Sequence, residues 1–306
     1  MMRPSLPAFL AVALLACASG ATTPTTPASP PPLLVLPTPP TSLAAAQAPC
    51  PTPPVPVAAP APSTAPVELM RPPAVPFPVT VAAKAVVDAT DRDEADRQLD
   101  AGRHAVELLS FLALRPGDRV AELAAGGGYT TELLARAVGP KGKVWGENNA
   151  FIMKFAEQPW TARLAKPAMK NVVRVDKELD APFPPDAKNL DAIVIVLFYH
   201  DTVWMGAERD RMNKAVYDAL RRGGQYVVVD HSAPEGTGTA DVKATHRIDE
   251  LFVLREIERA GFHHVESADF LRNPSDTRDW NDSPRQATDS GRRGTSDRFV
   301  LKFIKP

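Results

Sequence analysis

The part of this 306-residue sequence beyond residue 80 has no cysteine, because the only two are Cys17 and Cys50. Disulfide bonds and cysteine metal ligands are therefore excluded from that part. A basic excess is also missing: Lys and Arg number 35, Asp and Glu number 36, and the formal net charge is -1. Proteins that neutralise a nucleic-acid backbone need such an excess, so the composition argues against nucleic acid as a substrate.

Charge is nearly absent before residue 80. Only Arg3, Glu68 and Arg71 are charged there, and about two-thirds of the 33 prolines fall in the same stretch. Such a composition cannot form a packed core. Residues 18–80 are therefore predicted to be a disordered Pro/Ala-rich tether, a spacer in polyproline II and extended conformations. A ligand for proline-recognition domains is the alternative, although no docking site stands out.

The apolar run from Leu6 to Leu15 is far shorter than the ~20 residues that span a bilayer. With Arg3 before it, the run predicts a signal peptide over residues 1–17. Leu14-Leu15-Ala16-Cys17 resembles the lipobox of bacterial lipoproteins, which implies an acylated cysteine that anchors the chain to a membrane. An ordinary signal cleaved near Ala18 to Ala21 is the alternative. Both predict an exported protein of the cell envelope, periplasmic or membrane-anchored.

Residues 81–306 carry nearly all the charge and suit one α/β domain. Strands are expected at Arg119–Leu123, which is predicted to be buried, and at Lys143–Glu147, Val172–Val175, Leu190–Leu197, Gln225–Asp230, His264–Phe270 and Arg298–Ile304. Strands that alternate with helices predict a mainly parallel sheet covered on both faces. About 25 polar residues join the last two strands in place of a crossover helix, so their pairing is expected to be antiparallel.

Helices are expected where apolar residues recur at helical spacing. The expected helices lie within residues 104–114, from Thr130 to Val138, through Met212, Val216 and Leu220 to a stop at Gly223-Gly224, and from Ile248 through Ile257 to Gly261.

Ligands of such sheets bind outside the carboxyl ends of the strands, so the turn after the first strand is the first candidate site. It reads Glu122-Leu123-Ala124-Ala125-Gly126-Gly127-Gly128. Glycines there permit positive φ and let the backbone approach a ligand closely. Oxidoreductases use G-x-G-x-x-G for a pyrophosphate, but Thr131 stands at the third glycine position. This departure disfavours a nucleotide-dependent oxidoreductase.

The stretch LRPGDRVAELAAGGGYTTELLARAVGPKGKVWGENN resembles motif I of class I S-adenosylmethionine-dependent methyltransferases. The resemblance extends over the whole domain and is closest to a bacterial group of exported, predicted methyltransferases of unknown substrate; the local sequence is also similar to protein-isoaspartate methyltransferases. It implies a Rossmann-like seven-stranded sheet with an antiparallel last strand, S-adenosyl-L-methionine as cofactor, and a small-molecule or protein acceptor. The family pattern is acidic-x-Gly-x-Gly-x-Gly, and Ala124 replaces its first glycine.

The resemblance assigns cofactor binding to the turn, through Glu122, Ala124, Gly126, Gly128 and Tyr129.

In the family, an acidic residue that ends the second strand accepts hydrogen bonds from both ribose hydroxyls, and such charged bonds contribute about 1.5 to 3 kcal/mol each. Glu147 or Asn148 occupies this place; we prefer Glu147 as acceptor, with Asn148 beside it. A solvated loop acid is the alternative. Asp176, after the third strand, stands where the family contacts the adenine amino group, unless it is an ordinary turn residue.

The fourth strand runs into Phe198-Tyr199-His200-Asp201, where the family places substrate-facing and catalytic residues. His200, oriented by Asp201, is predicted to be the general base if the acceptor must lose a proton. The alternative is a histidine that caps the strand end while Asp201 begins the next helix. His231 is a second candidate base, whereas His246 is expected at the surface or in packing.

Metal binding is not predicted, because no histidine-carboxylate cluster has the sequence spacing of a zinc site. A noncatalytic envelope binding protein of the same fold is the rival function. The loss of glycine at Ala124 and the absence of a clear acceptor motif after the fourth strand favour that rival.

Overall fold

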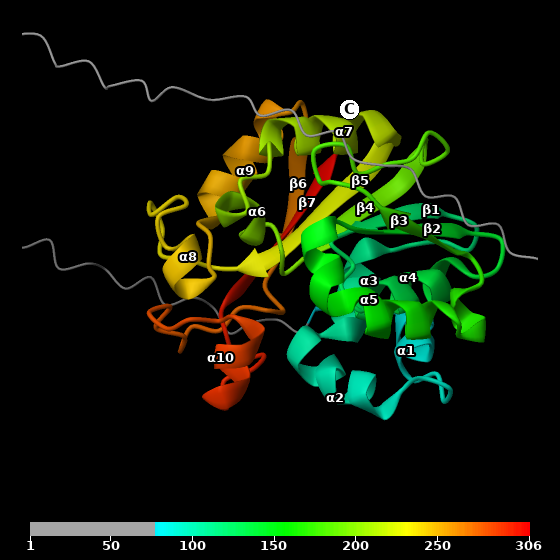
Figure 1. Ribbon diagram of the computed structural model, residues 1–306, viewed down its shortest axis with the longest axis horizontal. Helices are drawn as coiled ribbons and strands as arrows, with labels where there is room; N and C mark the ends of the chain where they lie inside the picture. The colour runs from blue at the N-terminus through cyan, green and yellow to red at the C-terminus, as the bar shows by residue number, and fades with distance from the viewer. Residues whose placement is uncertain (1–76) are drawn as a thin grey trace, which may run out of the picture. The chain divides into compact units, whose positions relative to one another are not determined.

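The computed structural model describes residues 77–306, so the predicted signal peptide, the lipobox and nearly all of the tether lie outside the described residues. One seven-stranded sheet carries helices on both faces (Figure 1). The strands are β1 Arg119–Leu123, β2 Lys143–Asn148, β3 Val172–Asp176, β4 Leu190–Val196, β5 Leu220–His231, β6 His263–Ala268 and β7 Arg298–Ile304. The helices are α1 Val81–Val87, α2 Glu94–Arg103, α3 Ala105–Leu112, α4 Tyr129–Val138, α5 Ala150–Leu164, α6 Asp201–Trp204, α7 Arg209–Ala219, α8 Val242–Thr245, α9 Glu250–Arg259 and α10 Pro284–Asp289, with a 3-10 turn η1 at Pro167–Met169. Over residues 77–306, none of these helices has the length and apolar character that a membrane span requires.

The strand order is β3-β2-β1-β4-β5-β7-β6. Strands β1 to β5 pair in parallel, and β7 lies antiparallel between β5 and β6. The order reverses between β1 and β4, which makes their carboxyl ends the topological switch point of the sheet. The predicted Rossmann-like fold, with seven strands and an antiparallel last strand, is confirmed.

Alternating side chains of the central strands face two separate apolar layers. Val194 and Val227 pack with the helices α1, α3 and α4, whereas Ile193, Ile195 and Val228 pack with α7 and α9. Figure 1 shows these two helix layers on opposite faces of the sheet. Each such side chain stabilises the fold by about 1.5 to 3 kcal/mol. Burial on both faces explains why these strands read as continuous apolar runs.

Strand β5 is longer than the sequence predicted. The prediction of a helix that includes Leu220 was wrong at its end, because α7 ends at Ala219 and Leu220 has an extended backbone with ψ 145. Gly224 therefore lies inside β5 and does not stop a helix. A Cβ at Gly224 would lie 2.9 Å from the carbonyl oxygen of Leu190, so close strand approach requires glycine there.

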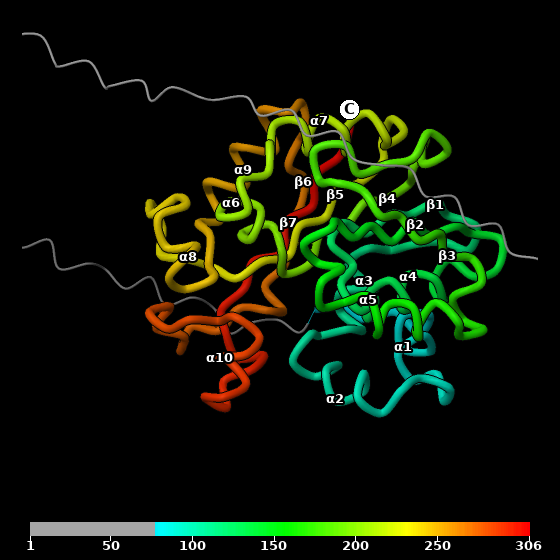
Figure 2. Tube along the Cα trace, viewed as in Figure 1, coloured from blue at the N-terminus to red at the C-terminus, as the bar shows by residue number. Residues whose placement is uncertain are grey.

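Residues 269–297, called here the β6–β7 connection, pass over the carboxyl end of β5 (Figure 2). The amide of Ser232 donates to the carbonyl of Asp297 at 2.9 Å, and the amide of Asp282 donates to the carbonyl of Thr245 at 2.9 Å. The polar segment that the sequence placed between two antiparallel strands thus covers one part of the ligand-binding edge.

Candidate functional site at the carboxyl edge

The glycine turn has a left-handed residue at every second position. The φ angle is 55° at Ala124, 56° at Gly126 and 81° at Gly128. These are the three places where the family pattern has glycine. Ala124 therefore keeps the turn geometry that its missing glycine would give, at a conformational cost of about 1 kcal/mol.

Four hydrogen bonds join the turn to the end of β2. Glu147 accepts from the amide of Ala124 through Oε2 at 3.0 Å, and its carbonyl accepts from the amide of Ala125 at 2.8 Å. The Asn148 side chain accepts from the amide of Gly126 at 2.7 Å and donates to its carbonyl at 3.0 Å. The amide group of Asn148 is thus engaged with the turn, which leaves Glu147 as the residue with a free acceptor atom.

That free atom is Oε1 of Glu147, a buried oxygen with no hydrogen-bond partner among the described residues. Burial, and then the negative charges of Glu178 and Asp176, raise the pKa of Glu147 to about 8. An unpaired buried acceptor costs about 1 to 3 kcal/mol. A ligand hydroxyl that donates to Oε1 would remove this cost, so the atom fits the predicted ribose acceptor.

Only one of the turn's two left-handed glycines faces open space. A Cβ at Gly126 would meet no atom within 4 Å. A Cβ at Gly128 would meet the ring of Trp160 at 2.3 Å and the side chain of Arg163 at 2.9 Å. The missing side chain at Gly126 therefore leaves space for a ligand, whereas the missing side chain at Gly128 leaves space for the ring of Trp160.

Glu122 and Tyr129 support the turn from within the protein. The Thr131 hydroxyl donates to Glu122, and burial raises the pKa of this carboxyl to about 7. The Tyr129 hydroxyl donates to Asp100 at 2.6 Å. Both side chains therefore serve contacts within the protein, whereas a side chain at Gly126 would meet open space.

Asp176 ends β3 with its carboxylate exposed. It lies 2.9 Å from the guanidinium of Arg174. Asn148 and Asp176 are register partners in the sheet, so the carboxylate lies at the same edge as the glycine turn. Its predicted contact with an adenine amino group stays a prediction.

Arg103 lies beside the turn, and sequence reasoning missed it. Its guanidinium stands 4.8 Å from the centre of the Tyr129 ring, and burial lowers its pKa. It lines a cavity of only about 10 Å³ together with Thr130 and Leu197, at the switch point. No carboxylate of residues 77–306 lies within ion-pair distance, 4.0 Å, of this guanidinium. The side chain therefore offers a positive charge for an anionic ligand group.

A second cluster begins where β4 ends. Leu197 has φ 58°, and this left-handed step turns the chain toward His200. The His200 ring is buried, and its Nδ1 lies 2.7 Å from Oδ1 of the fully buried Asp230 at the end of β5. The backbone amide of His200 donates to the other oxygen of Asp230 at 2.7 Å. Asp230 thus holds the ring through Nδ1, a contact that the sequence did not predict, while the predicted partner Asp201 lies at the other ring nitrogen.

The other nitrogen of His200 faces two further polar groups. Nε2 lies 3.1 Å from Oδ1 of Asp201 and 3.3 Å from Nδ1 of His246. Burial alone would lower the pKa of His200, but the carboxylates of Asp230 and Asp201 outweigh it and raise the pKa to about 10. Both ring nitrogens are engaged and the ring is cationic at neutral pH, so the geometry does not fit His200 as a solitary general base. The same surroundings hold the pKa of Asp201 below its usual range.

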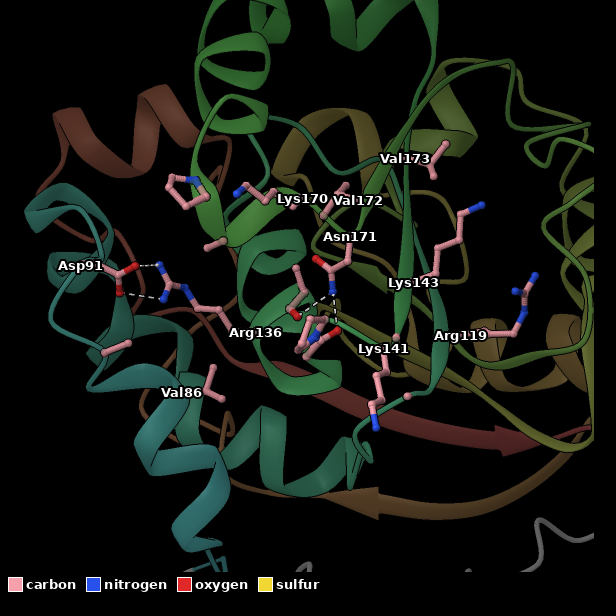
Figure 3. Close-up of a pocket in the computed structure, with 18 of the residues that line it drawn as sticks. Val86, Asp91, Arg119, Arg136, Lys141, Lys143, Lys170, Asn171, Val172 and Val173 are labelled. Carbon is pink, nitrogen blue, oxygen red and sulfur yellow. Dashed lines mark hydrogen bonds and ion pairs between the residues drawn. The ribbon is translucent and has the colours of Figure 1, made fainter.

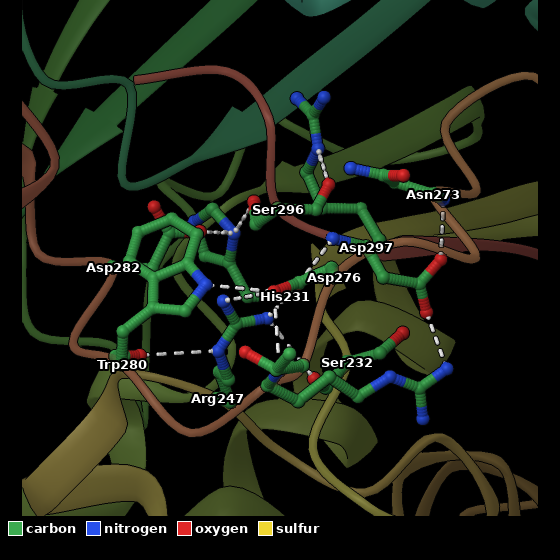
Figure 4. A network of polar contacts seen from close by, with 12 residues as sticks. His231, Ser232, Arg247, Asn273, Asp276, Trp280, Asp282, Ser296 and Asp297 are labelled. Carbon is green, nitrogen blue, oxygen red and sulfur yellow. Dashed lines mark hydrogen bonds and ion pairs between the residues drawn. The ribbon is translucent and has the colours of Figure 1, made fainter. Parts of the chain in front are cut away.

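His231 is sealed under the β6–β7 connection. Its Nδ1 lies 2.5 Å from Oδ2 of Asp282 and 2.9 Å from the hydroxyl of Ser296. Burial lowers the pKa of His231, although Asp282 acts in the opposite direction. Next to it, Arg247 is fully buried and forms an ion pair of 2.7 Å with Asp276 (Figure 4). A base that acts on an acceptor must be reachable, and this covering argues against His231.

Two larger hollows lie away from the switch point. One, of about 1050 Å³, is lined by Arg119, Lys141, Lys143 and Lys170 (Figure 3), at the amino ends of the first strands. That edge is opposite to the one where open α/β sheets bind ligands. The other, of about 760 Å³, lies beyond the carboxyl end of β5 and includes Ser232 among its lining residues. Because this cavity lies at the carboxyl edge of the sheet, it is the better candidate of the two for binding a substrate.

His246 was expected at the surface or in packing, yet it joins the β4 cluster from the end of α8. His200 and Asp201 are adjacent in sequence, whereas His246 follows Asp201 by 45 positions. Metal-site patterns depend on short spacing, so they could not detect a cluster assembled by the β5–α8 segment. The only sequence signal was the chemistry of the three residue types.

No protein-family model matches the chain. Among solved structures, it is similar to a SAM-dependent methyltransferase from Aquifex aeolicus, with 16% identity, 74% of this chain and 100% of that chain covered, and a TM-score of 0.48. It is also similar to a glycopeptide N-methyltransferase complexed with sinefungin, with 16% identity, 74% and 98% coverage and a TM-score of 0.46. A SAM-dependent O-methyltransferase from Thermotoga maritima has 17% identity, 74% and 71% coverage and a TM-score of 0.43.

Proposed function

We propose that this chain transfers the methyl group of S-adenosylmethionine to a small molecule or to a protein side chain in the bacterial cell envelope. The observation that carries the proposal is the junction of the glycine turn with β2. There, three alternating left-handed residues and four hydrogen bonds leave Oε1 of Glu147 without a donor. A nucleoside that presents ribose hydroxyls supplies the missing donor.

The chain's own residues divide the task of holding that cofactor. Glu147 accepts from the ribose, and Gly126 leaves room for close approach of the ligand to the backbone. Arg103 is placed to pair with the carboxylate of the methionine part, because it lies beside the turn and is free of ion pairs with the described residues. The bound cofactor supplies an activated methyl group. Positioning contributes most of the acceleration in such an in-line transfer.

The acceptor is expected on the β4–β5 side of the switch point. The cavity beyond β5 is lined by Ser232 and by the ion pair of Arg278 with Asp297, at 2.7 Å. A polar acceptor suits this lining better than an apolar one, because hydrogen bonds there would otherwise stay unmade.

The rival is a noncatalytic binding protein with the same fold. The engaged ring of His200 and the cavity of only about 10 Å³ at the switch point favour it. The two functions differ in turnover: both allow cofactor binding, but only an enzyme releases the demethylated product.

Calorimetry of the full chain with S-adenosylhomocysteine tests the cofactor assignment. We expect one site per chain, and we expect Gly126→Val to remove binding while the domain stays folded, because a side chain there enters the ligand's space. Gly291→Val is the matched control, since Gly291 also has positive φ and an open Cβ position but lies in the β6–β7 connection. Absence of binding to the folded wild-type chain would overturn the proposal.

Turnover is tested with a radiolabelled methyl donor and envelope extract as the source of acceptors. Label transferred by the wild-type chain, and lost in Gly126→Val, supports the enzyme. Cofactor binding without transfer to any fraction supports the noncatalytic rival.

The envelope location rests on residues 1–17, which lie outside the described residues. The proposal is that the mature chain begins at an acylated Cys17 and partitions with membranes, since two or more lipid chains give stable anchoring. Cys17→Ser should abolish lipidation and release the chain from the membrane fraction. Unchanged processing and membrane association in that variant would refute the lipoprotein.

A further inference from the structure

Three potential metal ligands meet at one point beside the carboxyl ends of β4 and β5. They are Nε2 of His200, Oδ1 of Asp201 and Nδ1 of His246. The three separations are 3.1 Å for His200 to Asp201, 3.2 Å for His246 to Asp201 and 3.3 Å for His200 to His246. Tetrahedral coordination at metal–ligand distances of about 2.0 to 2.2 Å places donor atoms about 3.3 Å apart. The triangle therefore matches one face of a metal coordination sphere.

Oδ1 of Asp201 is the atom on which the polar groups of this cluster converge. It accepts from the indole of Trp204 at 2.6 Å. Nε2 of His200 and Nδ1 of His246 lie 3.3 Å apart, and a hydrogen bond between them needs one of the two nitrogens to present a lone pair. A metal ion would take a lone pair from each of the two nitrogens and from Oδ1 of Asp201, while Trp204 keeps its place.

The surroundings provide the second layer of contacts that metal-bound histidines require. His200 presents Nε2 to the cluster because its Nδ1 is held 2.7 Å from Oδ1 of Asp230. Such carboxylate–histidine pairs fix the ring orientation and strengthen the ligand. Asp230 also accepts from the amides of His200 and His231, at 2.7 and 2.8 Å, so its position is determined by three donors. This is the arrangement of a prepared site.

The charge and the solvent exposure of the cluster also favour a bound metal ion. Asp201 and the buried Asp230 bring two negative charges, which a divalent cation with two neutral imidazoles would balance. The side chains of Asp201 and His246 are 17% and 22% exposed, whereas that of His200 is 3% exposed. The cluster is thus buried on the Asp230 side and open on the other, where a fourth ligand can enter.

The backbone on both sides of the cluster is held in an unfavourable conformation. Leu197, before His200, has φ 58°, and His246 itself has φ 53°. Left-handed residues other than glycine cost about 1 to 3 kcal/mol and concentrate at ligand sites. For His246 this conformation is what places the ring against His200 and Asp201.

We propose that His200, Asp201 and His246 bind one divalent transition-metal ion of the zinc class, with an open position for a further oxygen ligand. Two imidazoles and one carboxylate favour such ions over Mg²⁺, which prefers oxygen ligands. The site lies at the switch-point edge, so the ion acts as a Lewis acid that holds an acceptor oxygen; this last step rests on the proposed methyl transfer.

The test uses the full chain, purified without a polyhistidine tag and stripped with a chelator. Titration with Zn²⁺ by calorimetry should give one site per chain, and Co²⁺ should produce the visible absorption of a four- or five-coordinate ion. Mg²⁺ should not compete at equal concentration. His246→Asn keeps a residue that tolerates positive φ but lacks the imidazole, and it should weaken Zn²⁺ at least 100-fold. His264→Asn is the matched control, because His264 lies on the edge strand β6 and bonds to Ser267 at 2.9 Å.

A second variant, Asp201→Asn, covers the case in which His246→Asn does not fold. Asp230→Asn, a change in a positioning residue, should weaken the metal about 10- to 100-fold and shift the Co²⁺ spectrum. Absence of stoichiometric binding, or equal affinity in wild type, His246→Asn and Asp201→Asn, would overturn the site. S-adenosylhomocysteine binding to the stripped chain is measured in parallel, so that failure of the metal site is distinguished from failure of the proposed function.

Discussion

At the ends of β1 and β2 the chain is fixed by backbone groups, whereas at the ends of β4 and β5 it is fixed by buried charges. The glycine turn is bonded to Glu147 and Asn148 through its own amides and carbonyls. The other half depends on pairs such as Asp230 with His200 and Arg247 with Asp276. A turn held through its own amides and carbonyls tolerates changes of its own side chains but not of its shape, and buried charge tolerates neither loss nor reversal of a partner. The two halves should therefore fail in different ways.

The largest effect is expected from Gly128→Val, which changes the shape of the turn half. The new Cβ would lie 2.3 Å from the ring of Trp160, and a β-branched residue is strained at φ 81°. Overpacking and strain together should cost about 5 kcal/mol, much of the stability of a domain. Thermal unfolding followed by circular dichroism measures the loss. Gly126→Val is the control, and comparable destabilisation of the two variants would remove the distinction between them.

Arg247→Met tests the charged half with a change of similar volume. Arg247 is fully buried, and its removal leaves the carboxylate of Asp276 without its cation, at an expected cost of about 3 to 5 kcal/mol. Denaturant unfolding at neutral pH measures this loss in the free energy of unfolding. Arg278→Met is the matched comparison in the same network, because the Arg278 side chain is 34% exposed and should cost about 1 kcal/mol or less. Equal losses would contradict the assignment of the stabilising charge to Arg247.

Glu147→Gln should give a smaller effect of opposite sign. The folded-state pKa of Glu147 is raised to about 8, from an ordinary value of 4.5, so the folded chain keeps a proton that the unfolded chain releases. Stability from this group is fully present below pH 4.5 and is lost as pH rises to 8. The Gln variant lacks this loss, and its gain should grow from near zero at pH 4 to about 3 kcal/mol at pH 7.

Urea unfolding across that pH range measures the Glu147 effect, with Glu258→Gln on α9 as an exposed control that changes stability little. Above pH 8, where Glu147 is ionised, the same Glu147→Gln variant should bind S-adenosylhomocysteine more weakly, because an amide is a poorer acceptor than a carboxylate. A variant that is more stable and binds equally well would separate Glu147 from the cofactor.

The turn half was predictable from sequence because its parts are contiguous or lie on neighbouring strands. The glycines at positions 126 and 128 follow from local pattern, and so does β1, which appears with the expected bounds. What local pattern could not give was the direction of side chains: Gly128 faces Trp160, and Tyr129 faces Asp100.

The contacts at the ends of β4 and β5 could not be predicted from sequence, for a different reason. His246 reaches His200 only through the path of the segment after β5, and Asp282 reaches His231 from the β6–β7 connection. Such contacts depend on tertiary packing between segments that are remote in sequence. The assignment of Leu220 to a helix was wrong for a related reason, since its apolar side chain suits either a helix face or the buried start of β5.

The position of β7 between β5 and β6 has a consequence for the order of assembly during synthesis. β6 pairs with β7 alone among the strands of residues 77–306, so it has no neighbour in the sheet until residues 298–304 have been made. Until then the edge of β5 is also unpaired, and exposed edges invite aggregation. The connection that carries Asp276 and Asp282 lies between β6 and β7, so it is anchored to the sheet at both ends only after β7 has paired. We therefore expect hydrogen exchange on nascent chains that end before residue 298 to find the amides of β1 and β2 protected and those of β6 unprotected.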